Sequence, residues 1–106
     1  MIHVNIDYVD NSLSHLAIKG HGGLEYGKDV ICAGVSACLI GALNALDNAE
    51  NYDVVVEEGY CTIDKKNDTT MHDEVVLETL IMQLETIGKS YPDRLTIKFS
   101  GKEGNK

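Results

Sequence analysis

Basic residues are scarce in this sequence. Its 106 residues include nine Lys and Arg against seventeen Asp and Glu, which gives a formal net charge of −8. The nine basic residues are scattered along the chain rather than clustered. Binding to nucleic acid needs clustered Lys and Arg that neutralise phosphates, so we do not expect nucleic acid to be the main partner. An acidic chain attracts a basic partner instead.

Long apolar runs and paired cysteines are also missing. No stretch reaches the roughly 18 consecutive apolar residues that span a membrane, and the first residues contain no basic segment followed by a long apolar one, so we expect no membrane helix and no signal peptide. Cys32, Cys38 and Cys61 are an odd number of cysteines without paired spacing, which argues against a disulfide framework. We therefore expect free thiols in a reducing compartment, the cytoplasm, and no metal or other cofactor.

The length suits one domain with a modest core, here residues 1–106. Alternating apolar residues predict strands, and apolar residues at three- and four-residue spacing predict helices. The strands are expected at residues 2–8, 13–19, 53–57, 60–64 and 95–99, and the helices at residues 30–46 and 71–87. This order, β-β-α-β-β-α-β, predicts an α+β domain with an antiparallel or mixed sheet and two helices packed on it.

The ends and faces of the two helices can also be predicted. Small residues occupy much of the first helix outside its apolar stripe, and we expect it to be buried on most faces. Thr70 is the expected N-cap of the second helix, with the acidic Asp73 and Glu74 in its first turn. Gly88 and Pro92 are expected to end it.

The candidate chemistry lies where the first helix begins. Asp29 stands at the N-cap position and Cys32 at the third helical position. A thiol there faces unpaired backbone N–H groups and the positive end of the helix dipole, and both favour the thiolate. His21 lies eleven residues earlier, at a strand end, and the Gly-rich segment between them allows its imidazole to reach the sulfur. A Cys–His pair suffices for nucleophilic acyl transfer, and the first-turn amides offer an oxyanion hole. His72 is the other histidine we consider as a base.

Other interpretations of the same residues stay open. Cys32 is also compatible with a small core residue, and then the chain is a binding module. Gly22, Gly27 and Lys28 fit part of a phosphate-binding loop, but Asp29 occupies the position that requires Ser or Thr and repels phosphate. A zinc site at His21 and Cys32 lacks two further clustered ligands.

The run from Gly20 to Ala37 is the most specific feature. Gly20-His21, Tyr26-Gly27, Asp29-Val30-Ile31-Cys32-Ala33 and Val35-Ser36-Ala37 resemble the signature of the ribosomal-processing cysteine protease (Prp) family of bacteria. Gly22 and Gly34 replace alanines that are usual in that signature, and Val30-Ile31 replaces Ile-Val. None of these differences removes a reacting group. The resemblance extends over the whole chain in length and element order.

The resemblance implies roles for individual residues. It makes His21 the base and Cys32 the nucleophile, with Asp29 and Ser36 as supporting residues, although Ser36 is equally compatible with a tight helix contact. Apart from the resemblance, the glycines between His21 and Cys32 predict a flexible active-site loop that bound substrate orders, because glycine loses the most backbone entropy on ordering. The loop consists of Gly22, Gly23, Leu24, Glu25, Tyr26, Gly27 and Lys28.

The resemblance implies a substrate and an assembly as well. Members of the family remove a short N-terminal extension from large-subunit ribosomal protein twenty-seven, after an aromatic or otherwise hydrophobic pair, and they resemble homodimers. We therefore expect a basic ribosomal protein as substrate, and neither nucleic acid nor a membrane as a direct partner. The alternative is a non-catalytic, ribosome-associated binding module of the same fold.

Overall fold

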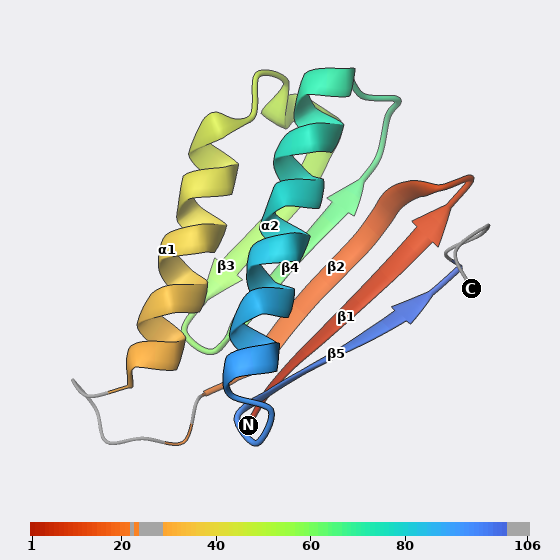
Figure 1. Cartoon of the computed structure of the whole chain (residues 1–106). Helices are drawn as coiled ribbons and strands as arrows, with labels where there is room; N and C mark the ends of the chain where they lie inside the picture. Colours follow the sequence, from red (N-terminus) through yellow and green to blue (C-terminus); the bar gives the residue numbers. More distant parts are fainter. Residues whose placement is uncertain (22, 24–28, 102–106) are drawn as a thin grey trace.

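Alternating apolar residues build a sheet, and two amphipathic helices cover one of its faces (Figure 1). The computed structural model describes residues 1–21, 23 and 29–101. The elements are β1 (Ile2–Val9), β2 (Ser12–Gly20), α1 (Val30–Ala45), a short 3-10 helix η1 (Ala49–Asn51), β3 (Tyr52–Glu57), β4 (Tyr60–Lys65), α2 (Met71–Ser90) and β5 (Leu95–Ser100). The predicted α+β class and the order of the seven main elements are confirmed.

The sheet is mixed, with strand order β3-β4-β2-β1-β5. Strand β5 pairs with β1 in parallel, and the other neighbours are antiparallel. The predicted hairpin joins β1 to β2 through Asp10 and Asn11, whose φ angles are 53° and 63°. Two successive positive φ angles match the twist of a two-residue hairpin turn, and Asp and Asn tolerate them better than most residues.

The core lies between the sheet and the helices. On β1 every second side chain, from Ile2 through Val4 and Ile6 to Tyr8, is buried, whereas its other residues face away from the helices. Helix α2 adds the buried Leu77, Leu80, Ile81 and Leu84, which recur at helical spacing. The sheet and both helices therefore share one core cluster, and the end of β2 and the start of α1 are fixed to the same framework.

Helix α1 differs from its prediction. Only Ile31, Val35, Leu39 and Ala42 are buried in it, so burial follows one stripe rather than most faces. The small residues of the other faces, such as Ala37 and Gly41, are exposed. Small side chains permit close packing but do not require it, and in this chain α1 packs on the sheet and α2 from one side only.

Helix α2 begins where it was predicted and ends later. The Thr70 hydroxyl accepts a hydrogen bond from the Asp73 amide over 3.3 Å, as an N-cap does. The helix continues through Gly88 to Ser90. A Cβ at Gly88 would lie 3.2 Å from Leu95 Cδ2, so this glycine serves close packing of α2 on β5 rather than helix termination. Within the described residues, neither helix is long and apolar enough to cross a membrane.

Candidate active site

Asp29 and Cys32 lie together at the start of α1. The carboxylate of Asp29 accepts a hydrogen bond from the Cys32 amide over 3.0 Å, and its carbonyl oxygen accepts one from the Ala33 amide over 3.1 Å. Asp29 is therefore the N-cap that the sequence predicts. Cys32 is half-buried at the N-terminal end of the helix, and it borders a cavity.

His21 reaches this helix end from the sheet. It follows Gly20, the last residue of β2, and its side chain is exposed. Its Nδ1 atom lies 3.8 Å from Cys32 Sγ. The backbone amide of Gly20 donates a hydrogen bond over 2.9 Å to the carbonyl of Gly59, in the turn between β3 and β4. The end of β2 and the start of α1 thus bring the two residues that the sequence selects into contact.

A cavity of about 680 Å³ opens beside this pair. His21, Asp29, Cys32 and Ser36 all line it, so the four predicted site residues border one space. Its apolar wall comes from β1, β2, β3, β4 and α1, namely Ile2, Ile18, Val35, Leu39, Ile40, Val56 and Cys61. This arrangement offers an apolar surface to a peptide whose carbonyl group approaches the sulfur.

The turn between β3 and β4 supplies lining residues that the sequence alone did not indicate. Glu57, Glu58, Gly59 and Tyr60 border the cavity. They come close to His21 because β2 pairs with β4, with Lys19 opposite Tyr60. No motif in the sequence marks this non-local pairing. The sequence does indicate a turn at Glu58-Gly59. It does not indicate that β4 pairs with β2, which is what places this turn beside His21.

The predicted active-site loop is mostly outside the described residues. Gly22 and residues 24–28, including the Tyr26-Gly27 part of the signature, are not described. Gly23 is exposed and has a φ angle of +87°, and a Cβ there would lie 2.8 Å from Arg94 Nη1.

The other two cysteines have different surroundings. Cys38 is half-buried on α1 and lies against the core cluster. Cys61 is buried in β4, and burial raises the pKa of its thiol to about 11. At Cys61 the thiol is therefore the stable form near neutral pH, which suits a structural residue.

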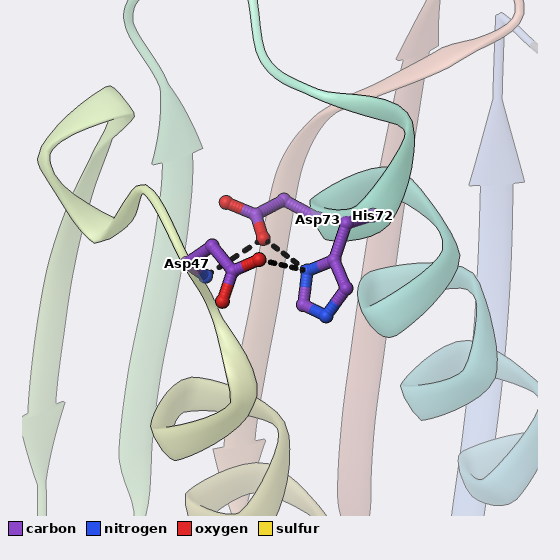
Figure 2. Close-up of side chains that lie close together, drawn as sticks. All are labelled: Asp47, His72 and Asp73. Carbon is purple, nitrogen blue, oxygen red and sulfur yellow. Dashed lines mark hydrogen bonds and ion pairs between the residues drawn. The ribbon is translucent and has the colours of Figure 1, made fainter.

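His72 lies at the opposite end of the helix layer from Cys32. It is the second residue of α2, beside the segment that follows the C-terminal end of α1 (Figures 1 and 2). Cys32 is the third residue of α1, and the helix continues to Ala45, so the two ends are roughly 20 Å apart at about 1.5 Å per residue. The interpretation of His72 as an alternative base for Cys32 is therefore wrong.

His72 belongs instead to a cluster with Asp47 and Asp73 (Figure 2). The buried carboxylate of Asp73 accepts hydrogen bonds from the backbone amides of Asp47 and Asn48, each over 2.8 Å. His72 Nδ1 lies 2.9 Å from Asp73 Oδ1 and 3.3 Å from Asp47 Oδ2. Because the Asp73 oxygens already hold the backbone, this cluster fastens the segment after α1 to the start of α2.

The comparisons with known proteins agree with the fold and identify the family. The sequence profile described as "Cysteine protease Prp" matches residues 1–96. The chain belongs to the Prp cysteine protease family. Two curated relatives are named "Ribosomal processing cysteine protease Prp". One, from Staphylococcus aureus, is 30% identical over 105 residues, covering 93% of this chain and 99% of the relative. The other, from Bacillus subtilis, is 28% identical over 97 residues, covering 83% and 87%.

Solved structures of Prp proteins share the fold. The crystal structure of the S. aureus ribosomal processing protease Prp with a covalently linked product peptide has a TM-score of 0.84 at 27% identity, covering 93% of this chain and 99% of that one. The same protease with a substrate peptide has a TM-score of 0.73 at 25% identity, with the same coverage. The predicted family is confirmed, and as a Prp protein the chain is a cysteine protease. The roles of its individual site residues remain predictions.

Proposed function

We propose that this chain is an endopeptidase that removes the N-terminal extension of bacterial large-subunit ribosomal protein twenty-seven, with Cys32 as nucleophile and His21 as general base. The observation that carries the proposal is the 3.8 Å contact between Cys32 Sγ and His21 Nδ1 at the edge of a large cavity. A thiol beside an imidazole at a helix N-terminus is the combination that nucleophilic acyl transfer requires.

The reaction follows from this contact. His21 takes the proton of the Cys32 thiol, and the sulfur attacks the carbonyl carbon of the scissile peptide bond. When the C–N bond breaks, His21 returns the proton to the leaving amine and the acyl group remains on sulfur as a thioester. Water, activated by the same imidazole, then hydrolyses the thioester and restores the thiol.

The hydrogen bonds of α1 limit which amides can stabilise the developing oxyanion. The Cys32 amide already donates to Asp29, and the Ala33 amide donates to the Asp29 carbonyl. The amides of Val30 and Ile31, in the first turn, are the remaining candidates from this helix. Asp29 then acts by fixing the backbone that carries the nucleophile, and Ser36 borders the space in which the substrate lies.

The cavity supports a substrate with both apolar and basic residues. Its wall is largely apolar, which suits the hydrophobic pair that the family resemblance places before the cleaved bond. Glu57 and Glu58 border it, and the chain as a whole has a net charge of −8. Ribosomal proteins are basic, so long-range attraction favours their approach. We place the activity in the cytoplasm, where ribosomal proteins are made and thiols stay reduced.

The test is cleavage of ribosomal protein twenty-seven that carries its extension, read by the mass of the product. The parent protein and the Cys38→Ser variant are expected to release the extension, because Cys38 lies against the core and outside the cavity lining. The Cys32→Ser variant is expected to fold and release nothing, since an alcohol is a poor nucleophile without a stronger base. Undiminished cleavage by Cys32→Ser would contradict the proposal.

The family resemblance also implies an assembly, and we propose a homodimer. Exposed apolar side chains on α2, such as Val75 and Met82, lie outside the cavity lining and provide surface that a second copy would cover. Sedimentation velocity at micromolar concentration tests this. A single species with the mass of one chain would contradict it.

A further inference from the structure

The turn between β3 and β4 lies against the proposed active site. It consists of Glu58 and Gly59, between the paired residues Glu57 and Tyr60. Gly59 has a φ angle of +71°, a conformation that glycine adopts without strain. Its carbonyl oxygen accepts the hydrogen bond of the Gly20 amide over 2.9 Å. Gly20 directly precedes His21. The turn is therefore held beside the histidine by this hydrogen bond and by the pairing of Glu57 with Tyr60.

The His21 ring lies where the side chain of any residue other than glycine would start at position 59. A Cβ added at Gly59 would lie 2.7 Å from Nε2, 3.1 Å from Cε1 and 3.5 Å from Cδ2 of His21, and these are its three nearest atoms. The first distance is far shorter than a van der Waals contact. The Nδ1 atom of the same ring lies 3.8 Å from Cys32 Sγ. The imidazole is therefore placed between the glycine on one side and the sulfur on the other.

We propose that Gly59 is a positioning residue that sets the place of the His21 imidazole relative to Cys32. This inference rests on the proposed roles of Cys32 and His21. Any side chain at position 59 forces the ring to move, because the ring ends an exposed side chain that turns about two bonds, whereas the turn is held in the sheet. Misplacing a reacting group by about 1 Å can lower a rate by roughly 10²-fold.

The first test compares Gly59→Ala and Gly59→Asn with the parent protein. Peptide cleavage gives kcat and KM, and mass spectrometry follows alkylation of Cys32 by iodoacetamide across pH. We expect kcat to fall at least about 10-fold with a much smaller change in KM. We also expect alkylation of Cys32 to require higher pH, because a displaced imidazole no longer stabilises the thiolate. Asparagine tolerates a positive φ better than alanine, so the two variants differ in backbone strain but both carry a Cβ.

Asn11→Ala is the matched control for backbone strain. Asn11 has a φ angle of 63° in the two-residue turn at the other end of the sheet (Figure 1). Alanine there suffers a comparable backbone penalty without touching the site. We expect a lower melting temperature with unchanged kcat and an unchanged alkylation profile.

A double-mutant cycle separates an effect through His21 from any other. Once His21→Ala has removed the ring, Gly59→Ala should lower kcat no further. Additive losses would overturn the proposal, as would a folded Gly59→Ala with the kcat and alkylation profile of the parent, or loss of the fold in both Gly59 variants. If His21→Ala itself leaves turnover and the alkylation profile unchanged, the proposed function fails. If only the Gly59 variants have no effect, this inference alone fails.

Discussion

The backbone amide of Cys32 donates a hydrogen bond to the carboxylate of Asp29 over 3.0 Å, so the residue that starts helix α1 also holds the backbone of the proposed nucleophile. Four residues that border the cavity are connected in pairs: Asp29 with Cys32, and Gly59 with His21. Asp29 fixes Cys32, and Gly59 limits where His21 can lie.

Asp29→Asn should retain most activity, whereas Asp29→Ala should not. Asparagine caps helices as well as aspartate does, and replacing a cap by alanine costs about 0.5–2 kcal/mol of stability. We expect Asp29→Ala to lower both the melting temperature and kcat. Thermal unfolding and peptide cleavage measure the two effects. A stable but inactive Asp29→Asn would show that the negative charge, rather than the cap, is needed.

The three cysteines should react at different rates with a thiol reagent. Burial raises the pKa of Cys61 to about 11, so its thiol stays protonated near pH 7 and reacts slowly. Cys32 is accessible beside an imidazole, so iodoacetamide should label it first, as mass spectrometry of the digested protein would reveal. Equal rates at Cys32 and Cys38 would argue against an activated thiol.

His21→Ala should slow cleavage by roughly 10²–10⁴-fold, the usual contribution of a general acid–base. The pH–rate profile should also change because one titrating group is gone. His72→Gln is the control, since this histidine lies at the other end of α1 and should leave both rate and profile unaltered. A His21→Ala variant with the rate and profile of the parent would mean that another group takes the proton.

The Asp47–His72–Asp73 cluster should make stability depend on pH. The hydrogen bond with Asp73, together with the charges of Asp47 and Asp73, raises the pKa of His72 despite some desolvation. Burial alone would raise the pKa of Asp73, but its hydrogen bonds with the amides of Asp47 and Asn48 and with His72 lower it. The His72 contribution is therefore complete below its unfolded pKa of about 6.5 and is lost as pH rises through the higher folded value.

The Asp73 contribution is present above its unfolded pKa of about 3.9 and is lost as pH falls through the lower folded value. Both contributions are present between about pH 4 and 6.5. Thermal unfolding of the parent and of His72→Gln should thus differ most between about pH 4 and 6.5 and converge as pH rises through the folded pKa of His72. A difference that is constant over this range, or grows with pH, would contradict this account of the cluster.

Local parts of the fold were predictable because local chemistry determines them. The alternation of residues 2–8 gave β1, the Asp10-Asn11 pair gave the hairpin turn, and Asp29 and Thr70 gave the two helix starts. The contact between Cys32 and His21 was predictable from the family signature. In the structure, Cys32 Sγ lies 3.8 Å from His21 Nδ1.

Non-local features were not predictable from the residues alone. The approach of Gly59 to His21 depends on the pairing of β2 with β4, and alternation indicates a strand without naming its partner. The exposed small residues of α1 failed as a sign of burial, because they permit packing on several faces without providing a partner. The sequence predicted that Asp73 lies in the first turn of α2, where its charge favours the helix dipole, but it did not predict that Asp73 is buried. Its hydrogen bonds to the backbone after α1 depend on the tertiary fold.

The most direct test of the account is covalent capture of the nucleophile. A peptide vinyl sulfone that ends in two phenylalanines is incubated with the parent protein, and the modified residue is located by mass spectrometry of the digest. We predict one adduct per chain, on Cys32, with loss of cleavage in proportion to labelling and slower capture in His21→Ala. An adduct on Cys38 or Cys61 instead, or full cleavage activity in a protein whose Cys32 is completely modified, would contradict the assignment of Cys32 as the nucleophile.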